Sequence, residues 1–526
     1  MVVIGSGGAG LIAAISSAEQ GCSVVVLSKT VRGSASATSY SSGFFTFPDD
    51  ELSVGEYKEY IRRVGKNLSR ENLLEALGNH ARDSLLQLRS WGATIRFLGG
   101  GHATIADSAR IPVASGEGLI SELGGIASSH GVAFLENAFV TDLLVKDGRV
   151  FGVDYINWTT GRAHRILCKA VILATGGGGR IFRRTDAPAR VTGDGYALAL
   201  GAGLALEDME FVQFYPLGFD EPRFPCWMIR LPVLDLARLT DGMGREFLKE
   251  EMKARGLRDG MAVSLFARDM AARLIQEKLA DGGEVLLHLE DIDRSCWKEW
   301  DLRKSLGCYP RGIAPWEYGP VHVSPLAHYF CGGVSIDART STSIEGLFAA
   351  GEVTAGVDGA SRVGGNALTG MVFSGVTAGR EAALLSRSGS PRPFKGKETE
   401  KPIPRGFSPE KGLSPGMLRD EIKKLNQECL GPLREGKSIL GGISALEEYR
   451  RSLPVVKTEK PTDLLEALEL KSMILTSLAV GYSALSREES RGVHFRMDHP
   501  EEVTGYERPQ QVRIEGEKFV TGFKNQ

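Results

Sequence analysis

Cysteine pairs with metal-binding spacing are absent from this sequence of 526 residues. Its seven cysteines are scattered and never form a CxxC motif, and such an odd, dispersed set is typical of reduced thiols in a cytoplasmic protein. We therefore expect no iron–sulfur cluster and no metal site held by this chain alone. The cysteines are Cys22, Cys168, Cys226, Cys296, Cys308, Cys331 and Cys429.

Long apolar runs and an excess of charge are absent as well. No stretch reaches the roughly 18 apolar residues of a membrane span, and the first residues read as a strand rather than a signal peptide, so we expect no direct membrane insertion. The formal net charge of −2 gives no electrostatic reason to expect nucleic acid as a partner. The length predicts two or three domains, each with its own core.

What the sequence does contain, at its start, is a strand, a glycine-rich turn and a helix. Residues 2–29 read VVIGSGGAGLIAAISSAEQGCSVVVLSK, with Gly5, Gly7 and Gly10 in GxGxxG spacing. The first glycine allows the tight turn, the second lets backbone approach a pyrophosphate, and the third lets the helix pack on its strand, so the unit is predicted to hold a nucleotide. Ser28 and Lys29 end the second strand where an acidic residue would bind the ribose of NAD, which argues against a plain NAD dehydrogenase.

The rest of the chain is organised discontinuously. Residues 33–43 are rich in small hydroxyl side chains and predict a loop against a cofactor, and residues 169–179 read as a buried strand that ends in glycines. A more charged and aromatic stretch then interrupts this pattern, which returns at residues 332–379. We predict a nucleotide domain from residues 1–216 and 331–386, an inserted domain from 217–330, a Pro- and Lys-rich linker from 387–415, and a C-terminal helical domain from 416–526.

Ten segments follow one another in the order of a known family. Among them are VVIGSGGAGLIAA from residue 2, ILATGGGGRIF from 172, TGDGYALALGAG from 192, FARD from 266, HYFCGG from 328 and GASRVGGNALTG from 359. In these segments the chain resembles the flavoprotein subunits of succinate dehydrogenase and fumarate reductase, a group that also includes L-aspartate oxidase. The resemblance implies an α/β fold, with a Rossmann-like FAD-binding domain, an inserted α+β capping domain over the flavin and a C-terminal helical domain.

The resemblance also implies bound FAD and assigns residues to it. The respiratory enzymes attach FAD through a histidine in the loop after the second strand, and residues 30–46 contain no histidine, so we expect noncovalent FAD. Lys29 is expected on the adenosine side, and Asp194 and Glu352 at cofactor hydroxyls, while a helix start at 365–368 stabilises charge on the reduced flavin. The predicted cofactor residues are Gly5, Gly7, Gly8, Gly10, Ser28, Lys29, Ala174, Gly176, Asp194, Glu352, Gly365, Asn366 and Leu368.

The implied chemistry is hydride transfer between a carbon and flavin N5, coupled to proton transfer at the neighbouring carbon. Arg268 matches the family's proton donor; arginine holds its proton tightly, so this role requires a desolvated site and a carboxylate neighbour, for which Asp269 is the local candidate. His328 and Arg362 match the residues that bind the two ends of a carboxylic acid substrate.

Several positions depart from the family pattern. Tyr215 replaces a substrate-facing histidine, and the threonine and glutamate of another family segment are missing from residues 226–239, where Asp235 is the only acidic residue. Asp358 replaces a histidine and is expected to repel a dianion, by about 1 kcal/mol in water and more when buried. These changes favour a monoacid, a larger acid or a thioester over succinate or fumarate itself.

Three functions stay open on the sequence. The first is an FAD-dependent oxidoreductase subunit that acts on a small carboxylic acid and exchanges electrons with an iron–sulfur partner. The second is a stand-alone amino-acid oxidase like L-aspartate oxidase, and the third is a non-catalytic flavin scaffold, against which the presence of Arg268, His328 and Arg362 argues. The first function predicts a cytoplasmic protein that reaches a membrane only through its partner.

Overall fold

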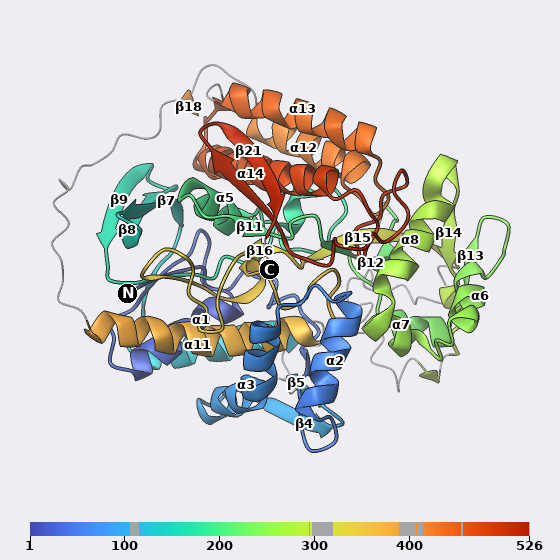
Figure 1. Ribbon diagram of the computed structural model, residues 1–526, viewed down its shortest axis with the longest axis horizontal. Helices are drawn as coiled ribbons and strands as arrows, with labels where there is room; N and C mark the ends of the chain where they lie inside the picture. The colour runs from blue at the N-terminus through green and yellow to red at the C-terminus, as the bar shows by residue number, and fades with distance from the viewer. Residues whose placement is uncertain are drawn as a thin grey trace.

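The centre of the molecule, which lies between helices above and below it in Figure 1, holds a five-stranded parallel sheet. A computed structural model describes residues 1–105, 115–222, 224–293, 295–296, 319–388, 407–408, 414–453 and 456–524. The strand order is β17 (Leu347–Ala349), β10 (Val171–Leu173), β1 (Val2–Ile4), β2 (Val25–Leu27) and β6 (Ala133–Leu135), and every neighbouring pair is parallel. Helices or strands cover both faces, which is why β1 and β10 read as continuous apolar runs. The predicted βαβ opening is therefore confirmed.

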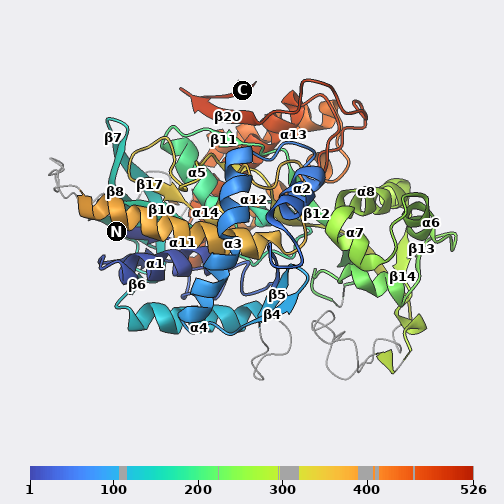
Figure 2. The ribbon, with the colours of Figure 1, turned by 60° about the horizontal axis from the view of Figure 1, so that its bottom comes forward.

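Two helices cross closely on one face of this sheet, α1 (Gly8–Glu19) and α11 (Asn366–Ser388) (Figure 2). Their contact consists of small residues: a Cβ on Gly379 would lie 2.4 Å from the carbonyl oxygen of Ala13, and Ser17 donates a hydrogen bond to the carbonyl of Gly379 at 2.9 Å. Because this approach aligns the two helices, both of their N-termini reach the same cavity. The layer also contains α2 (Val54–Val64), α3 (Glu71–Ser90), α4 (Ser115–Ser129) and the sheet of β3 (Phe44–Thr46), β5 (His102–Ile105) and β4 (Ile95–Gly99).

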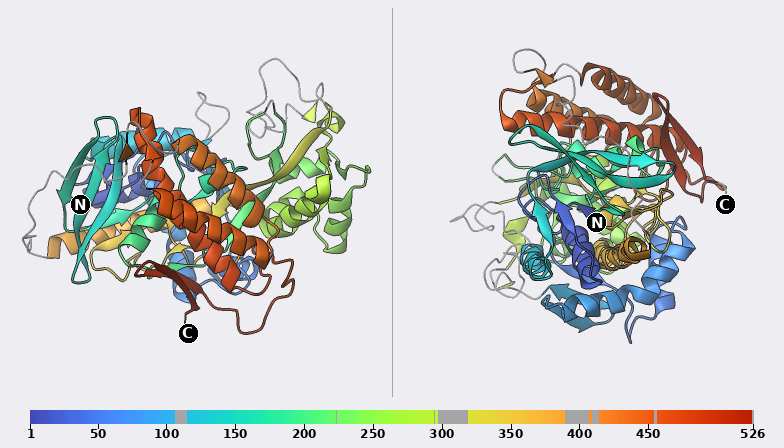
Figure 3. Two further views of the ribbon diagram at one scale, coloured as in Figure 1. Left: turned by 90° about the horizontal axis from the view of Figure 1, so that it is seen from above. Right: turned by 90° about the vertical axis from the view of Figure 1, so that its left-hand side faces the viewer.

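The other face is covered by an antiparallel sheet and by the C-terminal helices (Figure 3). Helix α14 (Pro461–Ser486) is buried along most of its length, so it packs against several layers at once. One hydrophobic core joins Leu173 of the central sheet to Ile474 and Leu478 of α14, which means that the predicted C-terminal domain has no separate core. The remaining elements here are β7 (Ala138–Lys146), β8 (Arg149–Asn157), β9 (Arg162–Leu167), α5 (Asp194–Gly201), α12 (Pro415–Cys429) and α13 (Gly436–Ser452).

The end of the chain adds strands to the C-terminal helical domain predicted for residues 416–526. Residues 510–523 form a hairpin of β20 (Gln510–Glu515) and β21 (Lys518–Phe523), which continues a sheet with β11 (Leu206–Glu207) and β16 (Gly333–Val334). Alternate residues of β20 are buried, as a strand with one covered face requires. The predicted linker, 387–415, lies mostly outside the described residues; within it, β18 (Phe407–Ser408) pairs with β19 (Val456–Lys457).

The inserted segment forms a lobe beside the main body (Figure 1). Its sheet has the order β12 (Val212–Phe219), β15 (Val321–Phe330), β14 (Val285–Leu287) and β13 (Leu239–Asp241), and helices α6 (Phe247–Ala254), α7 (Gly260–Phe266) and α8 (Arg268–Leu279) pack with it. A separate hydrophobic core extends from Tyr215 to Leu326. The boundary predicted at 216/217 falls inside β12, so this strand and β15 run from the main body into the lobe. Short 3₁₀ turns are η1 (Gly179–Ile181), η2 (Leu231–Asp235), η3 (Ala280–Gly282), η4 (Leu289–Asp291) and η6 (Gly351–Val353).

Within the described ranges, every helix lacks the uninterrupted apolar length that a membrane span requires.

Candidate active site

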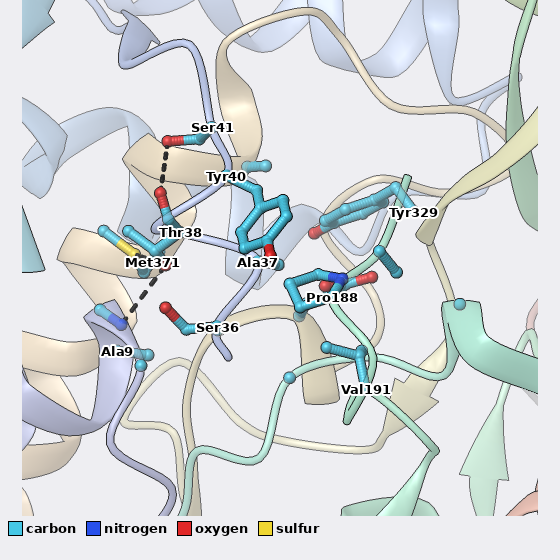
Figure 4. A pocket seen from close by; sticks show the side chains of 18 of the residues that line it. Ala9, Ser36, Ala37, Thr38, Tyr40, Ser41, Pro188, Val191, Tyr329 and Met371 are labelled. Carbon is cyan, nitrogen blue, oxygen red and sulfur yellow. Dashed lines mark hydrogen bonds between the residues drawn. The ribbon is translucent and has the colours of Figure 1, made fainter. Parts of the chain in front are cut away.

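A cavity of about 300 Å³ opens where the two helix N-termini of the main body face the lobe. The turn after β1, the loop at 33–44 and the segment at 362–371 line it from the main body, and residues of β12, α7 and α8 line it from the lobe. Figure 4 shows Ser36, Ala37 and Thr38 on one side of the cavity and Pro188, Val191 and Tyr329 across from them. The cavity is thus shared between parts of the chain that are far apart in sequence.

The glycine turn at one end of the cavity has no room for a side chain at Gly5 or Gly10. Gly5 has a φ of +109°, and a Cβ there would lie 2.2 Å from the carbonyl oxygen of Ala174. A Cβ on Gly10 would lie 1.9 Å from the carbonyl oxygen of Gly5, so this glycine sets the packing of α1 on β1, as expected from the motif. With Gly7 and Gly8 on the cavity wall, the turn fits a pyrophosphate at the start of a helix.

Most of the predicted cofactor residues border this one cavity. Gly10 does not, because it packs between helix and strand, and neither does the side chain of Asn366, which donates to Asp358 Oδ1 at 2.9 Å and accepts from the hydroxyl of Tyr57. Burial raises the pKa of Glu352 to about 7, and its carboxylate accepts from the backbone N–H of Phe330 at 3.1 Å. The cavity-lining members are Gly5, Gly7, Gly8, Ser28, Lys29, Ala174, Gly176, Asp194, Glu352, Gly365 and Leu368.

Lys29 is held in place by carboxylates from two distant elements. Its Nζ lies 2.6 Å from Asp194 Oδ2 and 2.9 Å from Glu469 Oε1, and Glu469 also pairs with Arg190 and Arg419, each at 2.8 Å. Burial alone would raise the pKa of Glu469, but these three cations hold this pKa below its usual value. A fully buried carboxylate on α14 therefore anchors a residue at the cavity wall.

Replacing Glu469 with alanine is expected to lower the free energy of unfolding by about 3 to 5 kcal/mol, because three cations lose their buried counter-charge. Urea unfolding followed by circular dichroism measures the effect. Glu466, one turn earlier on α14 and 3.6 Å from Arg419, is 29% exposed, so Glu466→Ala is the matched control and should cost less than about 1 kcal/mol. Equal losses in the two variants would contradict a special role for Glu469.

The predicted substrate residues meet at the other end of the cavity. Arg268 starts α8, Arg362 lies in the loop before α11, His328 lies near the end of β15, and Tyr215 lies on β12, yet all four line the same space. The guanidinium carbon of Arg268 is 5.2 Å from the ring centre of Tyr215, and the rings of Tyr215 and His328 are 5.3 Å apart. The guanidinium carbon of Arg362 lies 4.2 Å from the ring centre of Tyr329. Within the described part of the chain, the buried Nε atoms of both arginines have no hydrogen-bond partner, so the site offers donors to an anion.

Burial and the neighbouring Arg362 lower the pKa of Arg268 to about 10, while Tyr215 and Asp186 act in the opposite direction. At neutral pH the guanidinium stays charged, with only about one molecule in a thousand deprotonated. Arg268 therefore combines a cation's attraction for a carboxylate with a proton that is held less tightly than in water.

The cavity carboxylate that acts electrostatically on Arg268 is Asp186, not Asp269, its neighbour in sequence. Asp269 does not line the cavity; burial raises its pKa, and Lys66 and Arg273 are the cations that act on it. Asp186 lines the cavity, acts on Arg268 electrostatically and accepts from His328 Nδ1 at 2.8 Å. The sequence-based role of Asp269 is therefore not supported by its position, whereas Asp186 was missed because only the fold brings it to this site.

The structure changes the interpretation of three residues that depart from the family pattern, which are Tyr215, Asp235 and Asp358. The hydroxyl of Tyr215 accepts from the backbone N–H of Leu231 at 3.0 Å, which leaves its own proton free to donate into the cavity. Asp235 accepts from the backbone N–H of Gly260 at 2.8 Å and does not line the cavity, so it is not placed to replace the missing glutamate. Asp358 is bound by Tyr329 and Asn366 behind the cavity wall, which weakens the argument that it repels a dianion.

Two further cavity residues were not predicted as site residues, although one of them, Tyr329, follows His328 in the HYFCGG segment. Arg230, beside the 3₁₀ turn η2, adds another cation to the lobe side, and Tyr329 supplies the ring against which Arg362 lies. A charged residue directly after an aromatic and apolar run, such as CWMIR at 226–230, is the only local signal for Arg230.

Comparisons with known proteins agree with this geometry. Residues 1–368 match the family described as FAD binding domain, and residues 419–513 match the family described as fumarate reductase flavoprotein C-term. One subunit of the fumarate reductase (CoM/CoB) from Methanothermobacter marburgensis is 32% identical over 95% of this chain and 94% of its own length. An uncharacterized FAD-dependent oxidoreductase from Methanocaldococcus jannaschii is 31% identical over 99% of this chain and 96% of its own length.

The fold has solved counterparts too. The flavoprotein FrdA of E. coli quinol fumarate reductase, in a variant form, superimposes with a TM-score of 0.86 at 24% identity, covering 100% of this chain and 96% of that one. The glycine turn and the cavity fit the cofactor that the matched family binds. The chain therefore belongs to the family of FAD-dependent oxidoreductases that includes the flavoprotein subunits of fumarate reductase and succinate dehydrogenase.

Proposed function

We propose that this protein interconverts a carbon–carbon single bond and a double bond next to a carboxylate, in a small dicarboxylate of the succinate and fumarate class. The observation that carries the proposal is the convergence of Arg268, His328 and Arg362, from three separate elements, on one cavity. Because Asp358 is turned to Tyr329 and Asn366, a dianion is compatible with the surrounding cations. When bound, FAD supplies the donor and acceptor of hydride.

The residues of the chain supply substrate binding and proton transfer. Arg362 and His328 bind and orient the carboxylates, which holds the reacting carbons in one place. Arg268 holds the proton that the neighbouring carbon receives during reduction, and Asp186 lies where its charge eases the return of that proton. The lobe carries Arg268 and forms one wall of the cavity, so its side chains limit the water around the reacting atoms.

Anaerobic flavin spectroscopy tests this function. Fumarate should reoxidise the dithionite-reduced holoprotein and restore the flavin absorbance, whereas the monoacid crotonate should act far more slowly because it leaves one set of cations unpaired. Reoxidation by no unsaturated acid would overturn the proposal. Hydrogen peroxide formed from L-aspartate by the isolated chain would instead support an amino-acid oxidase.

FAD is proposed to be noncovalent, since the loop at 30–46 offers no histidine for attachment. Acid precipitation of the purified protein should leave the yellow flavin in the supernatant. Flavin that stays with the pellet after washing in denaturant would show a covalent bond and contradict this prediction.

The electron partner is proposed to be a separate iron–sulfur protein. None of the chain's cysteines has CxxC spacing, and the similar protein of M. marburgensis is named as one subunit of its fumarate reductase, which supports a division of labour between chains. A cytoplasmic location, with contact to a membrane only through the partner, is proposed on the same grounds.

A further inference from the structure

Asp186 and His328 form a pair in the cavity that no motif pointed to. The loop carrying Asp186 is fastened to β15 beside the histidine: Thr185 Oγ1 donates to the carbonyl of Ala327 at 2.6 Å, and the backbone N–H of Ala327 donates to the carbonyl of Arg184 at 2.9 Å. Asp186 Oδ2 then lies 2.8 Å from His328 Nδ1. Because the backbones are joined at this point, the carboxylate and the imidazole are held in one relative position.

The charges around His328 act in two directions. Arg268 on α8 and Arg362 in the loop before α11 oppose its protonation, while Asp186 favours it, and Tyr215 on β12 faces it with a neutral ring. Burial, with the two arginines, lowers the pKa of His328 below its usual value, so at neutral pH the ring is mainly neutral when no anion is present. Its single proton then resides on Nδ1, toward Asp186, and Nε2 carries a lone pair.

A neutral ring in this tautomer has no proton on Nε2 to donate to a carboxylate. A dicarboxylate entering the cavity neutralises Arg268 and Arg362, which removes the two charges that oppose protonation, while the charge of Asp186 remains. A second proton on the ring then gives Nε2–H a donor role and leaves Nδ1–H bound to Asp186.

We infer that Asp186 is a positioning residue that orients His328 through Nδ1 and causes the ring to take up one solvent proton when a dicarboxylate binds. The inference rests on the proposed function, because it requires a dicarboxylate in this cavity. The proton comes from water on binding and returns to water when the ligand leaves, so no other reactant is needed. In the pH range where binding takes up one full proton, the dissociation constant of the dicarboxylate should rise about tenfold for each unit by which the pH rises.

Titration calorimetry of the FAD-loaded protein with malonate, in buffers of different ionisation heat, measures this uptake directly. The wild type should take up about one proton per malonate, and Asp186→Asn should take up almost none and bind at least about tenfold more weakly. Asparagine keeps an oxygen that accepts from Nδ1, so a merely structural contact survives and only the charge is lost.

Asp220→Asn is the matched control, since Asp220 pairs with Arg184 of the same loop at 2.5 Å and does not contact His328. It should keep the uptake of the wild type. His328→Gln is a second variant that must also lose the uptake. Normal proton uptake in Asp186→Asn or in His328→Gln would overturn this inference but not the proposed function. A wild-type protein that binds no dicarboxylate would overturn both.

Discussion

Replacing Arg268 with alanine is expected to lower kcat for fumarate reduction about a thousandfold while FAD content stays unchanged. The guanidinium is the buried proton donor of the proposed reaction, and removing a positioned acid of this kind costs about a hundredfold to ten-thousandfold in rate. Stopped-flow measurement of flavin reoxidation by fumarate separates this chemical step from partner reactions. The same loss should appear with reduced viologen as the electron donor.

Two control variants separate proton donation by Arg268 from the effect of its positive charge. Arg268→Lys keeps a cation but changes its reach and geometry, so it should recover binding more than rate. Arg258→Ala, in the same lobe but with a side chain that is 88% exposed, should leave the rate unchanged. In the wild type the rate should fall as pH rises through about 10, because only the protonated form of Arg268 donates. A fast Arg268→Ala variant with an unchanged pH profile would refute this role.

The second large effect is expected at the glycine turn. Gly5→Ala should reduce FAD affinity by about tenfold to a hundredfold, since the new Cβ meets the carbonyl oxygen of Ala174 at 2.2 Å in a backbone conformation with φ of +109°. Relief of that collision moves the turn that lines the cavity. Flavin absorbance per protein, followed by titration of the stripped protein with FAD, gives the affinity.

Gly21→Ala is the control for Gly5→Ala, because it introduces backbone strain without a collision of the new Cβ with another atom. Gly21 follows the same helix and has a φ of +79°, but a Cβ at this position would meet no neighbouring atom within 4 Å. The variant should lose some thermal stability and keep its FAD. If Gly5→Ala also retained stoichiometric FAD, the turn would not be the pyrophosphate site.

The sequence predicted the features that depend on short-range spacing. Gly5, Gly7 and Gly10 lie within one turn and one helix start, so their positions follow from local geometry. The apolar strands of the parallel sheet and the discontinuous path through an inserted lobe also followed from local composition. The fold class was confirmed for this reason.

Contacts between distant segments were not predictable in the same way. Asp269 is next to Arg268 in sequence, but the backbone of α8 directs the two side chains to different surroundings, and Asp186 arrives from another loop. Asp358 was read as a charge facing the substrate, whereas its hydrogen bonds to Tyr329 and Asn366 hold it behind the wall. The hairpin at 510–523 was missed because its strand partner, β11, lies some 300 residues earlier.

By itself, therefore, the sequence determined the nucleotide turn and the interrupted α/β domain, and it predicted the cations of the proposed substrate site. Only the tertiary structure decided which side chains share the cavity, that Asp186 contacts His328, and that Glu469 pairs with Lys29. The physical reason is that a turn or a helix is specified by residues a few positions apart, whereas burial and charge pairing depend on segments that meet only after the core has formed.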